Sequence, residues 1–512
     1  MRRGTVSRVA ALLVLVSGAS GVAAAPVART RLGDLAGISR GATNAFLGIP
    51  YAAPPTGALR WRSPQPAAAW TGLRPARAFG HSCWQALSPQ GFRAWTHEYG
   101  VQGDISEDCL FLNVWAPAKT RGRLPVLVWI HGGAFTSGSG AVPIYDGRAL
   151  ARRGIVVVTI NYRVGVFGFL AHPDLTREAG GGPNANFGLQ DMIAALKWVR
   201  TNIAAFNGDP DAVTIAGQSA GAMAVHALVA SPRARGLFAR AIGESGLPDP
   251  ATPPIARAEA DGVAFARAKG AGSVAALRGM SPEALAASTG GNGINFGPVI
   301  DGVLLPGVAP VSRVPMLVGF NADEDSASGD AYGSRDPAAL GRLLGKLYGA
   351  AAARFAPFYP AATDAERAES DKQARRDGLF GALYWWRGQH GDGSPVYAYL
   401  WDHIEPGQQS DRWLAFHSSE IPYVFQTFDA SPERGFTAAD RALSDRLSTY
   451  WLNFIKRGDP NGGGLPRWPV FDTHAPMILR IGDRTASQAL LPPEKLAALK
   501  AFIAEGSRPD VF

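Results

Sequence analysis

Two serines stand at the centre of the pattern Gly-x-Ser-x-Gly, which between a strand and a helix exposes a serine hydroxyl for nucleophilic attack on a carbonyl carbon. The pattern surrounds Ser39 and Ser219. Because the chain contains 61 glycines, the pattern alone proves little and its context must decide. A strand-like run, residues 212–216, precedes Ser219, and an apolar helical run begins at Ala220. Ser39 stands in a Gly-rich stretch typical of a turn. We therefore expect Ser219 to be the nucleophile and Ser39 to be structural.

A loop that reads His-Gly-Gly-Ala begins at His131, directly after the apolar run 124–130. Attack on an ester carbonyl produces an oxyanion, which must be met by backbone N–H groups that already point at it. Small residues in such a loop let the backbone approach the substrate. We expect the N–H groups of Gly133, Ala134 and Ala220 to form this oxyanion hole. A Gly-Gly pair without a nearby nucleophile would predict only an ordinary turn.

The general base should be one of the histidines that follow the nucleophile in the chain, because enzymes with this serine turn have the order serine, acid, histidine. His417 follows a strand-like run that ends at Trp401, and the loop between them would let its side chain reach over the sheet edge. Spacing alone gives it only a small advantage over His403. The candidates by order are His226, His390, His403, His417 and His474.

Three adjacent carboxylates, Asp323, Glu324 and Asp325, follow the strand-like run 316–319. The carboxyl ends of parallel strands are where active sites of open sheets form. One of the three would therefore supply the acid that orients the base. Spacing does not choose among them, and a solvated turn or a helix N-terminus would produce the same pattern.

The elements around these residues predict an α/β fold with a large, mostly parallel sheet flanked by helices. Strand-like runs at 124–130 and 155–162 are almost entirely apolar, as in strands covered on both faces. Two Ala-rich or charged helical insertions, 251–288 and 336–392, are expected to form a lid over the active-site gorge. Further elements are expected at a helix over 188–202, a strand over 396–400 and an amphipathic helix over 441–457.

The N-terminus predicts a secretory signal peptide over residues 1–25, followed by a single catalytic domain over 26–512. Arg2, Arg3 and Arg8 precede or border the apolar run 9–16, and small residues follow it as far as Ala25. A membrane anchor is the alternative, but the run is too short to cross a bilayer. The protein is therefore expected to be periplasmic or extracellular.

The two cysteines, Cys83 and Cys109, lie on the exported part of the chain, where an oxidising compartment lets a disulfide persist. We expect them to be paired. Without Arg2, Arg3 and Arg8 the formal net charge falls from +8 to +5, which is modest for a chain of this size. The remaining cations are scattered, which argues against a nucleic-acid surface. No cluster has the spacing of metal ligands, so neither a metal nor an organic cofactor is expected.

Taken together, the sequence resembles the type B carboxylesterase and cholinesterase family of α/β-hydrolases over nearly all of the exported chain. The resemblance includes the nucleophile turn, the oxyanion loop and a set of shorter motifs. These are Phe-Leu-Gly-Ile-Pro-Tyr-Ala at 46–52, Leu-Arg-Trp at 59–61, Ser-Glu-Asp-Cys-Leu at 106–110, Asn-Tyr-Arg-Val-Gly at 161–165, Gly-Asp-Pro at 208–210, Pro-Val-Ile-Asp-Gly at 298–302 and the segment 451–460.

This resemblance implies the residue roles that spacing left open. It makes Ser219 the nucleophile, Glu324 the acid and His417 the base. It also implies a disulfide between Cys83 and Cys109. A structural ion pair between Arg60 and Glu107 is implied as well.

Three positions depart from the family pattern. Gln218 replaces the usual Glu before the nucleophile, and the loss of that negative charge should lower the pKa of His417. Asp325 replaces a Gly. The tryptophan that binds quaternary ammonium in cholinesterases is missing, with Tyr99 as the nearest match, so choline esters are not expected as substrates.

The expected activity is hydrolysis of small carboxylic esters through an acyl-enzyme on Ser219, with Phe135 and Phe296 lining the acyl side of the pocket. A non-catalytic recognition protein of the same fold is one alternative. An amidase, thioesterase or polyester hydrolase that uses the same triad is another, because leaving-group choice depends on the pocket. The sequence does not indicate the oligomeric state.

Overall fold

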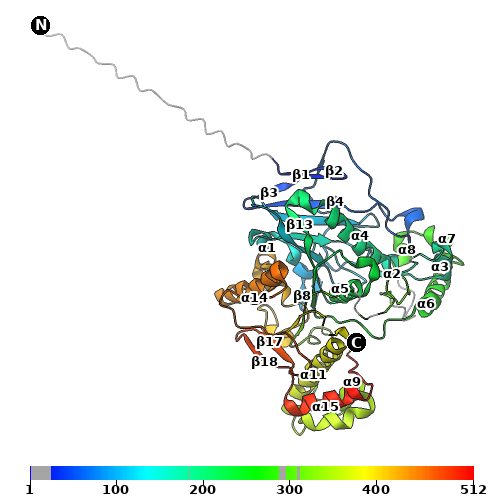
Figure 1. The fold of residues 1–512 in the computed structure, drawn as a ribbon. Coiled ribbons are helices and arrows are strands. Elements are labelled where there is room, and N and C mark those ends of the chain that lie inside the picture. Colours follow the sequence, from blue (N-terminus) through cyan, green and yellow to red (C-terminus); the bar gives the residue numbers. More distant parts are fainter. Residues whose placement is uncertain are drawn as a thin grey trace.

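The computed structural model describes residues 1, 25–182, 184–287, 296–307, 309, 312–391 and 393–511 (Figure 1). Its centre is an 11-stranded sheet in the order β18-β17-β16-β15-β14-β13-β11-β12-β10-β4-β3. The strands are β3 (Ile38–Arg40), β4 (Thr43–Pro50), β10 (Phe111–Pro117), β11 (Leu124–Ile130), β12 (Val156–Ile160), β13 (Gly208–Gln218), β14 (Arg240–Glu244), β15 (Met316–Asn321), β16 (Val396–Trp401), β17 (Met477–Ile481) and β18 (Ala486–Ala489). From β12 to β17 all neighbours in this order pair in parallel, and the pairs outside this range are antiparallel. The predicted α/β class with a mostly parallel sheet is confirmed.

Helices cover both faces of this sheet, as the apolar character of its central strands requires. Every residue of β12 is buried. The nucleophile helix α5 (Ala220–Ala230) and α4 (Phe187–Asn202) pack on one face, whereas α1 (Arg148–Arg152) and α14 (Ala438–Arg457) lie on the other (Figure 1). α14 begins with a capping box on Thr437, which explains why this amphipathic helix starts three residues before its predicted beginning.

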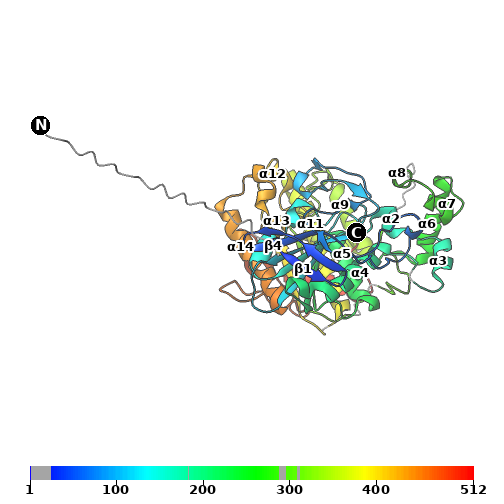
Figure 2. The same ribbon diagram turned by 90° about the horizontal axis from the view of Figure 1, so that it is seen from above.

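Both expected insertions are helical, and they occupy different places (Figures 1 and 2). The first contains α6 (Ile255–Ala268), α7 (Val274–Arg278) and α8 (Pro282–Ala286). The second contains α9 (Ala339–Tyr348), α10 (Ala352–Phe355) and α11 (Asp364–His390), and lies against the C-terminal helix α15 (Pro493–Ala504). Their predicted role as a lid stays a prediction.

Ser39 does not lie in a turn, which corrects the expectation from its Gly-rich surroundings. It is the middle residue of β3 and pairs with Asn44 of β4. The turn begins two residues later, at Gly41, whose φ of 71° suits a glycine. The glycines therefore mark the hairpin that follows Ser39, and no helix follows this serine as a nucleophile would require.

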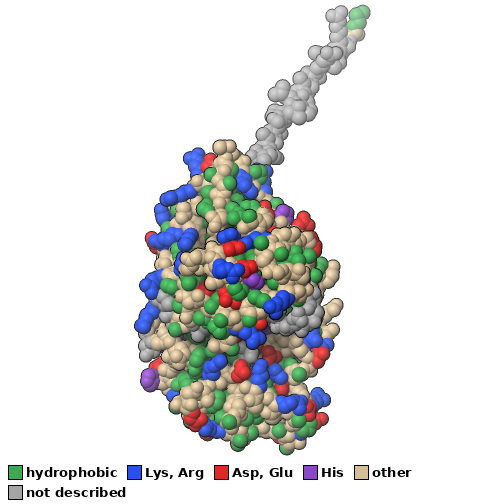
Figure 3. All heavy atoms as spheres, turned by 90° about the vertical axis from the view of Figure 1, so that its right-hand side faces the viewer, with side chains coloured by type: hydrophobic (Ala, Val, Ile, Leu, Met, Phe, Trp, Pro, Cys, Tyr) green, Lys and Arg blue, Asp and Glu red, His purple; other side chains and the backbone are tan. Residues whose placement is uncertain are grey.

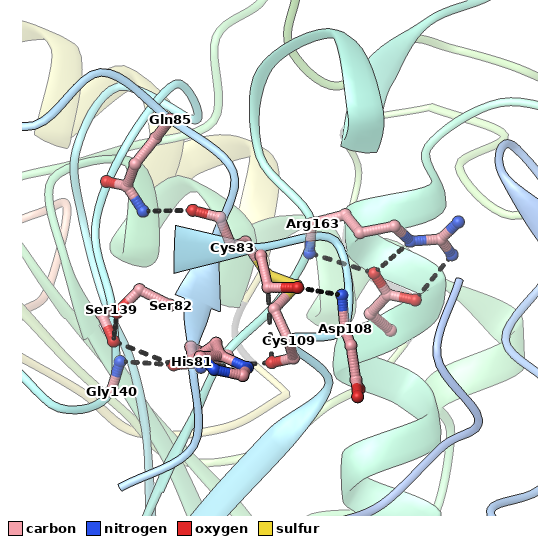
Figure 4. The surroundings of a disulfide bond; sticks show 12 residues. His81, Ser82, Cys83, Gln85, Asp108, Cys109, Ser139, Gly140 and Arg163 are labelled. Carbon is pink, nitrogen blue, oxygen red and sulfur yellow. Dashed lines mark hydrogen bonds and ion pairs between the residues drawn. A yellow bond between two sulfur atoms is a disulfide. The ribbon is translucent and has the colours of Figure 1, made fainter. Parts of the chain in front are cut away.

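A disulfide joins Cys83 to Cys109 and closes the loop of residues 84–108 (Figure 4). Gln85 at the start of the loop accepts a hydrogen bond from the backbone N–H of Gly138 at 2.7 Å. Beside the disulfide, Arg60 forms a buried ion pair with Glu107, as the resemblance implied. The loop of residues 84–108 is thus held at its base, and we call it the disulfide loop below.

The described part of the chain contains no helix with the length and apolar character needed to span a membrane. On the face shown in Figure 3, cationic and anionic side chains are interspersed rather than segregated. The expected signal peptide falls mostly on residues 2–24, which lie outside the described residues.

Candidate active site

Ser219 occupies the sharp turn between β13 and α5. Its φ of 59° lies in the left-handed region, where a non-glycine residue is strained. Its N–H donates to the carbonyl oxygen of Glu244 at 2.8 Å, which holds the turn against the neighbouring strand. A Cβ atom at Gly221 would lie 2.1 Å from the carbonyl oxygen of Ile130, so only glycine fits there. This is the geometry of a nucleophile elbow.

His417 and Glu324 come together at the carboxyl ends of the central strands. The Nδ1 atom of His417 is hydrogen-bonded to Oε2 of Glu324. The other carboxylate oxygen of Glu324 accepts the backbone N–H of Asn321 at 2.7 Å, which fixes the orientation of the carboxylate. His417 shares a cavity with Ser219. A serine, an imidazole and an orienting carboxylate therefore meet at one place.

The other two carboxylates of the acidic run point elsewhere. Asp323 accepts the N–H of Ala415 at 3.2 Å and the hydroxyl of Tyr332. Asp325 pairs with Arg375 at 2.9 Å on the surface. Only the middle carboxylate of the three is hydrogen-bonded to His417 within the described residues.

The rival histidine His403 is engaged in a different part of the molecule. Its two ring nitrogens bind Asp440 and Asp483 at 2.8 and 2.7 Å. Both nitrogens are thus occupied, and the residue does not line the cavity that contains Ser219. The remaining candidates by chain order also line no part of that cavity: His226, His390 and His474.

The charge environment of His417 favours its protonated form. Burial by itself lowers the pKa of the imidazole, whereas the charge and hydrogen bond of Glu324 raise it. The charges of Glu420 and Asp325 act in the same direction, so the pKa of His417 is raised above its ordinary value. Burial in turn raises the pKa of the Glu420 carboxyl to about 7. A raised pKa suits an imidazole that must accept a proton during the reaction.

Gln218, the departure noted in the sequence, contacts the other ring nitrogen. Its Nε2 atom lies 3.1 Å from Nε2 of His417. An amide N–H can only donate, so the imidazole accepts this bond at Nε2 and carries its proton on Nδ1, facing Glu324. In this structure Gln218 engages the single lone pair of Nε2, so the Ser219 hydroxyl would have to replace the amide there before His417 could take its proton.

The loop after β11 places unengaged N–H donors beside the nucleophile. Gly133 and Ala134 have φ angles of 111° and 53°. Their N–H groups, and that of Ala220, donate to no acceptor among the described residues. A Cβ atom at Gly132 would lie 3.1 Å from Cβ of Ser219, which shows how closely the loop approaches the serine. The three expected donors are therefore free to bind an oxyanion.

The cavity that contains Ser219 has a volume of ≈ 480 Å³ and draws one wall from the disulfide loop. Trp95 and Tyr99 line this wall. The indole N–H of Trp95 donates to the carbonyl oxygen of His417 at 2.9 Å. Sequence reasoning missed Trp95, because several aromatic residues lie between the two cysteines and no local pattern distinguishes this one. Neither helical insertion contributes a described residue to this cavity.

Phe135 and Phe296 come together in a second cavity of ≈ 220 Å³, next to α5. Met223 and the buried His226 line the same space. Met223 lies one helical turn after Ser219, whose carbonyl oxygen accepts its N–H at 3.0 Å. The two phenylalanines thus share a cavity other than the one that contains Ser219, and their role on the acyl side of the pocket stays a prediction.

This arrangement of serine turn, imidazole and carboxylate on a parallel sheet has close relatives among known proteins. The model of the carboxylesterase family matches residues 24–342 and 361–497. This chain belongs to the carboxylesterase family. It is therefore a carboxylic ester hydrolase with the α/β-hydrolase fold.

Individual members of the carboxylesterase family match most of this chain. The chain is 37% identical over 494 residues to fumonisin B1 esterase of Sphingopyxis macrogoltabida, covering 90% of this chain and 87% of the relative. It is 35% identical over 488 residues to para-nitrobenzyl esterase of Bacillus subtilis (strain 168), covering 88% and 94%. A solved structure of a PNB esterase superposes with a TM-score of 0.75 at 32% identity, covering 92% of this chain and 99% of the other.

Proposed function

We propose that this carboxylesterase hydrolyses small esters in two steps through an acyl-enzyme on Ser219. The observation that carries the proposal is the hydrogen-bonded pair of His417 and Glu324 in the cavity of a serine held on a strained turn. A serine hydroxyl is a weak nucleophile. It needs an adjacent base to activate it and a third group to orient that base. These three side chains meet that requirement.

In the first step His417 Nε2 takes the hydroxyl proton of Ser219 while Oγ attacks the ester carbonyl carbon. The carbonyl oxygen becomes an oxyanion that accepts the N–H groups of Gly133, Ala134 and Ala220. His417 then gives its proton to the departing alcohol, which leaves the acyl group on Ser219. In the second step water repeats the sequence and releases the acid. Each oxyanion donor contributes about 100- to 1000-fold to the rate.

The substrate we propose is a neutral, partly apolar ester. The cavity is lined by the rings of Trp95 and Tyr99 and by small loop residues. The carboxylate of Glu405 behind Tyr99 lies 3.4 Å from Arg434, so it does not present an unpaired charge to a cationic substrate. The names of the relatives refer to chemically different esters, which supports an ester substrate without selecting one.

We also propose that the protein is exported, with residues 1–25 as signal peptide and 26–512 as one catalytic domain. The disulfide of Cys83 and Cys109 supports this proposal, because such bonds persist in oxidising compartments. The test is the mass of the protein recovered outside the cytoplasm. We expect the mass of a chain that begins near Pro26. Recovery of the full-length chain inside the cell would contradict export.

The test of the catalytic proposal is hydrolysis of p-nitrophenyl esters, from acetate to long acyl chains, by the mature protein and by Ser219→Ala. Ser39→Ala is the matched control, because it removes the other serine of the same pattern. We expect the wild type and Ser39→Ala to turn over and Ser219→Ala to fall to background. Equal activity of Ser219→Ala and the wild type would contradict the proposal.

A further inference from the structure

Three side chains of metal-binding type lie together beside the active-site cavity. His97 and Glu98 belong to the short helix η2 (His97–Tyr99) of the disulfide loop, and Glu433 belongs to η9 (Pro432–Arg434). Nδ1 of His97 lies 3.5 Å from Oε2 of Glu98 and 3.4 Å from Oε1 of Glu433. One donor atom from each residue lies within 4.8 Å of the other two. The fold thus joins ligands that are more than 300 positions apart in the chain.

The buried carboxylate of Glu98 is a second observation that points to a cation site. Its side chain is 0% exposed, yet its Oε2 atom has no hydrogen-bond partner among the described residues. Its other oxygen is fully engaged by Thr96 and Arg434. A buried carboxylate oxygen without a partner is costly. The orphaned oxygen is the one that faces His97, so it is aimed into the cluster.

The spacing of the donor atoms fits a tetrahedral ion. Zinc binds imidazole nitrogen and carboxylate oxygen at about 2.0–2.2 Å, so two ligands of one ion are about 3.4 Å apart. Both distances from His97 Nδ1 agree with that value, and the donor oxygens of Glu98 and Glu433 lie within 4.8 Å of each other. His97 and Glu433 are 45% and 56% exposed, so an ion and a water molecule can reach the cluster from solvent.

We propose that His97, Glu98 and Glu433 bind one divalent transition-metal ion of the zinc type, with water as the fourth ligand. Arg434 pairs with one oxygen of Glu98, and the ion would bind the other oxygen together with Glu433 and His97, which would join η9 to the disulfide loop. Arg434, the next residue after Glu433, already donates to the carbonyl oxygen of Ala94 at 2.9 Å. The neighbouring Trp95 contacts His417, so the ion stabilises the wall of the cavity rather than the reacting atoms.

The experiment is calorimetric titration of Zn²⁺ into chelator-treated, tag-free mature protein, with thermal unfolding of the same samples. We expect about one ion per chain and a higher unfolding midpoint with zinc. Loss of even an outer partner weakens metal binding about 10- to 100-fold, so His97→Ala and Glu433→Gln should weaken it at least as much. Both side chains are partly exposed, and neither change should prevent folding.

Two control variants separate this site from ordinary surface histidines. His474→Ala removes an exposed histidine that binds Asp472 alone, and should titrate like the wild type. His403→Ala tests the histidine held between Asp440 and Asp483. Absence of zinc binding in the wild type, undiminished binding in His97→Ala, or loss of binding in His403→Ala would each overturn the proposal. Ester hydrolysis is not the readout, so the result is independent of the proposed catalytic mechanism.

Discussion

The turn that holds Ser219 and the disulfide loop that encloses its cavity are positioned by different means. The turn joins a buried strand to a buried helix, and Gly221 approaches the end of β11 so closely that only glycine fits there. The disulfide loop has little regular structure and depends on one disulfide, a buried ion pair and scattered side-chain bonds. The sheet therefore positions the nucleophile, whereas covalent and polar contacts position the loop that encloses its cavity.

The largest expected effect is a loss of activity on replacement of Glu324, which follows a strand of the central sheet. Glu324→Gln keeps the shape of the acid but removes its charge and allows the wrong tautomer of His417. In serine proteases with a serine, histidine and aspartate triad, replacing the carboxylate by its amide lowers kcat about 10⁴-fold. We expect a decrease of that order here, measured as kcat on the best p-nitrophenyl ester.

Asp325→Asn is the matched control for this change, because Asp325 is adjacent but pairs with Arg375. It should retain activity to within about tenfold, since its charge acts on His417 only from a distance. Equal losses in the two variants would mean that neither carboxylate acts through the hydrogen bond to His417.

The next largest effect concerns the stability that the disulfide of the loop contributes. Replacing both cysteines by serine opens a loop whose ends are 26 residues apart. In the chain-entropy model this should lower the free energy of unfolding by about 3–4 kcal/mol. Denaturant unfolding of the mature protein measures it, and treatment of the wild type with a reductant should reproduce most of the loss. An unchanged unfolding midpoint would show that the disulfide does not support the fold.

A smaller effect concerns the pH dependence of kcat/KM. General-base catalysis needs neutral His417, so activity rises with pH through the pKa of this residue. Gln218→Glu places a negative charge beside Nε2, which stabilises the imidazolium and raises its pKa further. The acidic limb of the kcat/KM profile should therefore move to higher pH by about one unit. A shift to lower pH would contradict the assignment of His417 as base.

The smallest expected effect concerns the hydrogen bond between Trp95 of the disulfide loop and the base His417. Trp95→Phe keeps an aromatic ring in the wall but removes the N–H that donates to His417. A single neutral hydrogen bond contributes about 0.5–1.5 kcal/mol, so kcat/KM should fall about two- to tenfold. Trp84→Phe is a control on the same loop outside the cavity of Ser219 and should be nearly neutral. A hundredfold loss in Trp95→Phe would place the ring in direct contact with the reacting ester.

Sequence patterns predicted the sheet well because its strands are continuous apolar runs. The run 155–162 became β12 (Val156–Ile160), and the run 212–216 became the longer β13 (Gly208–Gln218). Ser219 could also be predicted, since only this serine had a strand before it and a helix after it. In each case the signal is local in the sequence, and the structure follows it.

The remaining features depend on contacts between distant parts of the chain. Spacing could not choose among Asp323, Glu324 and Asp325, because the three differ only in the direction in which each side chain leaves the same turn. The bond from Trp95 to His417 spans 322 positions, and no local pattern encodes it. The family resemblance implied the acid, but it gave no indication of Trp95.

The most direct test of the acyl-enzyme is the intact mass of the protein, quenched in acid within the first turnovers of a slowly hydrolysed p-nitrophenyl ester. We expect a species heavier by one acyl group, carried by the peptide that contains Ser219, and its absence in Ser219→Ala. Ester hydrolysis without any acylated species, or an acyl group on another residue, would contradict the acyl-enzyme mechanism.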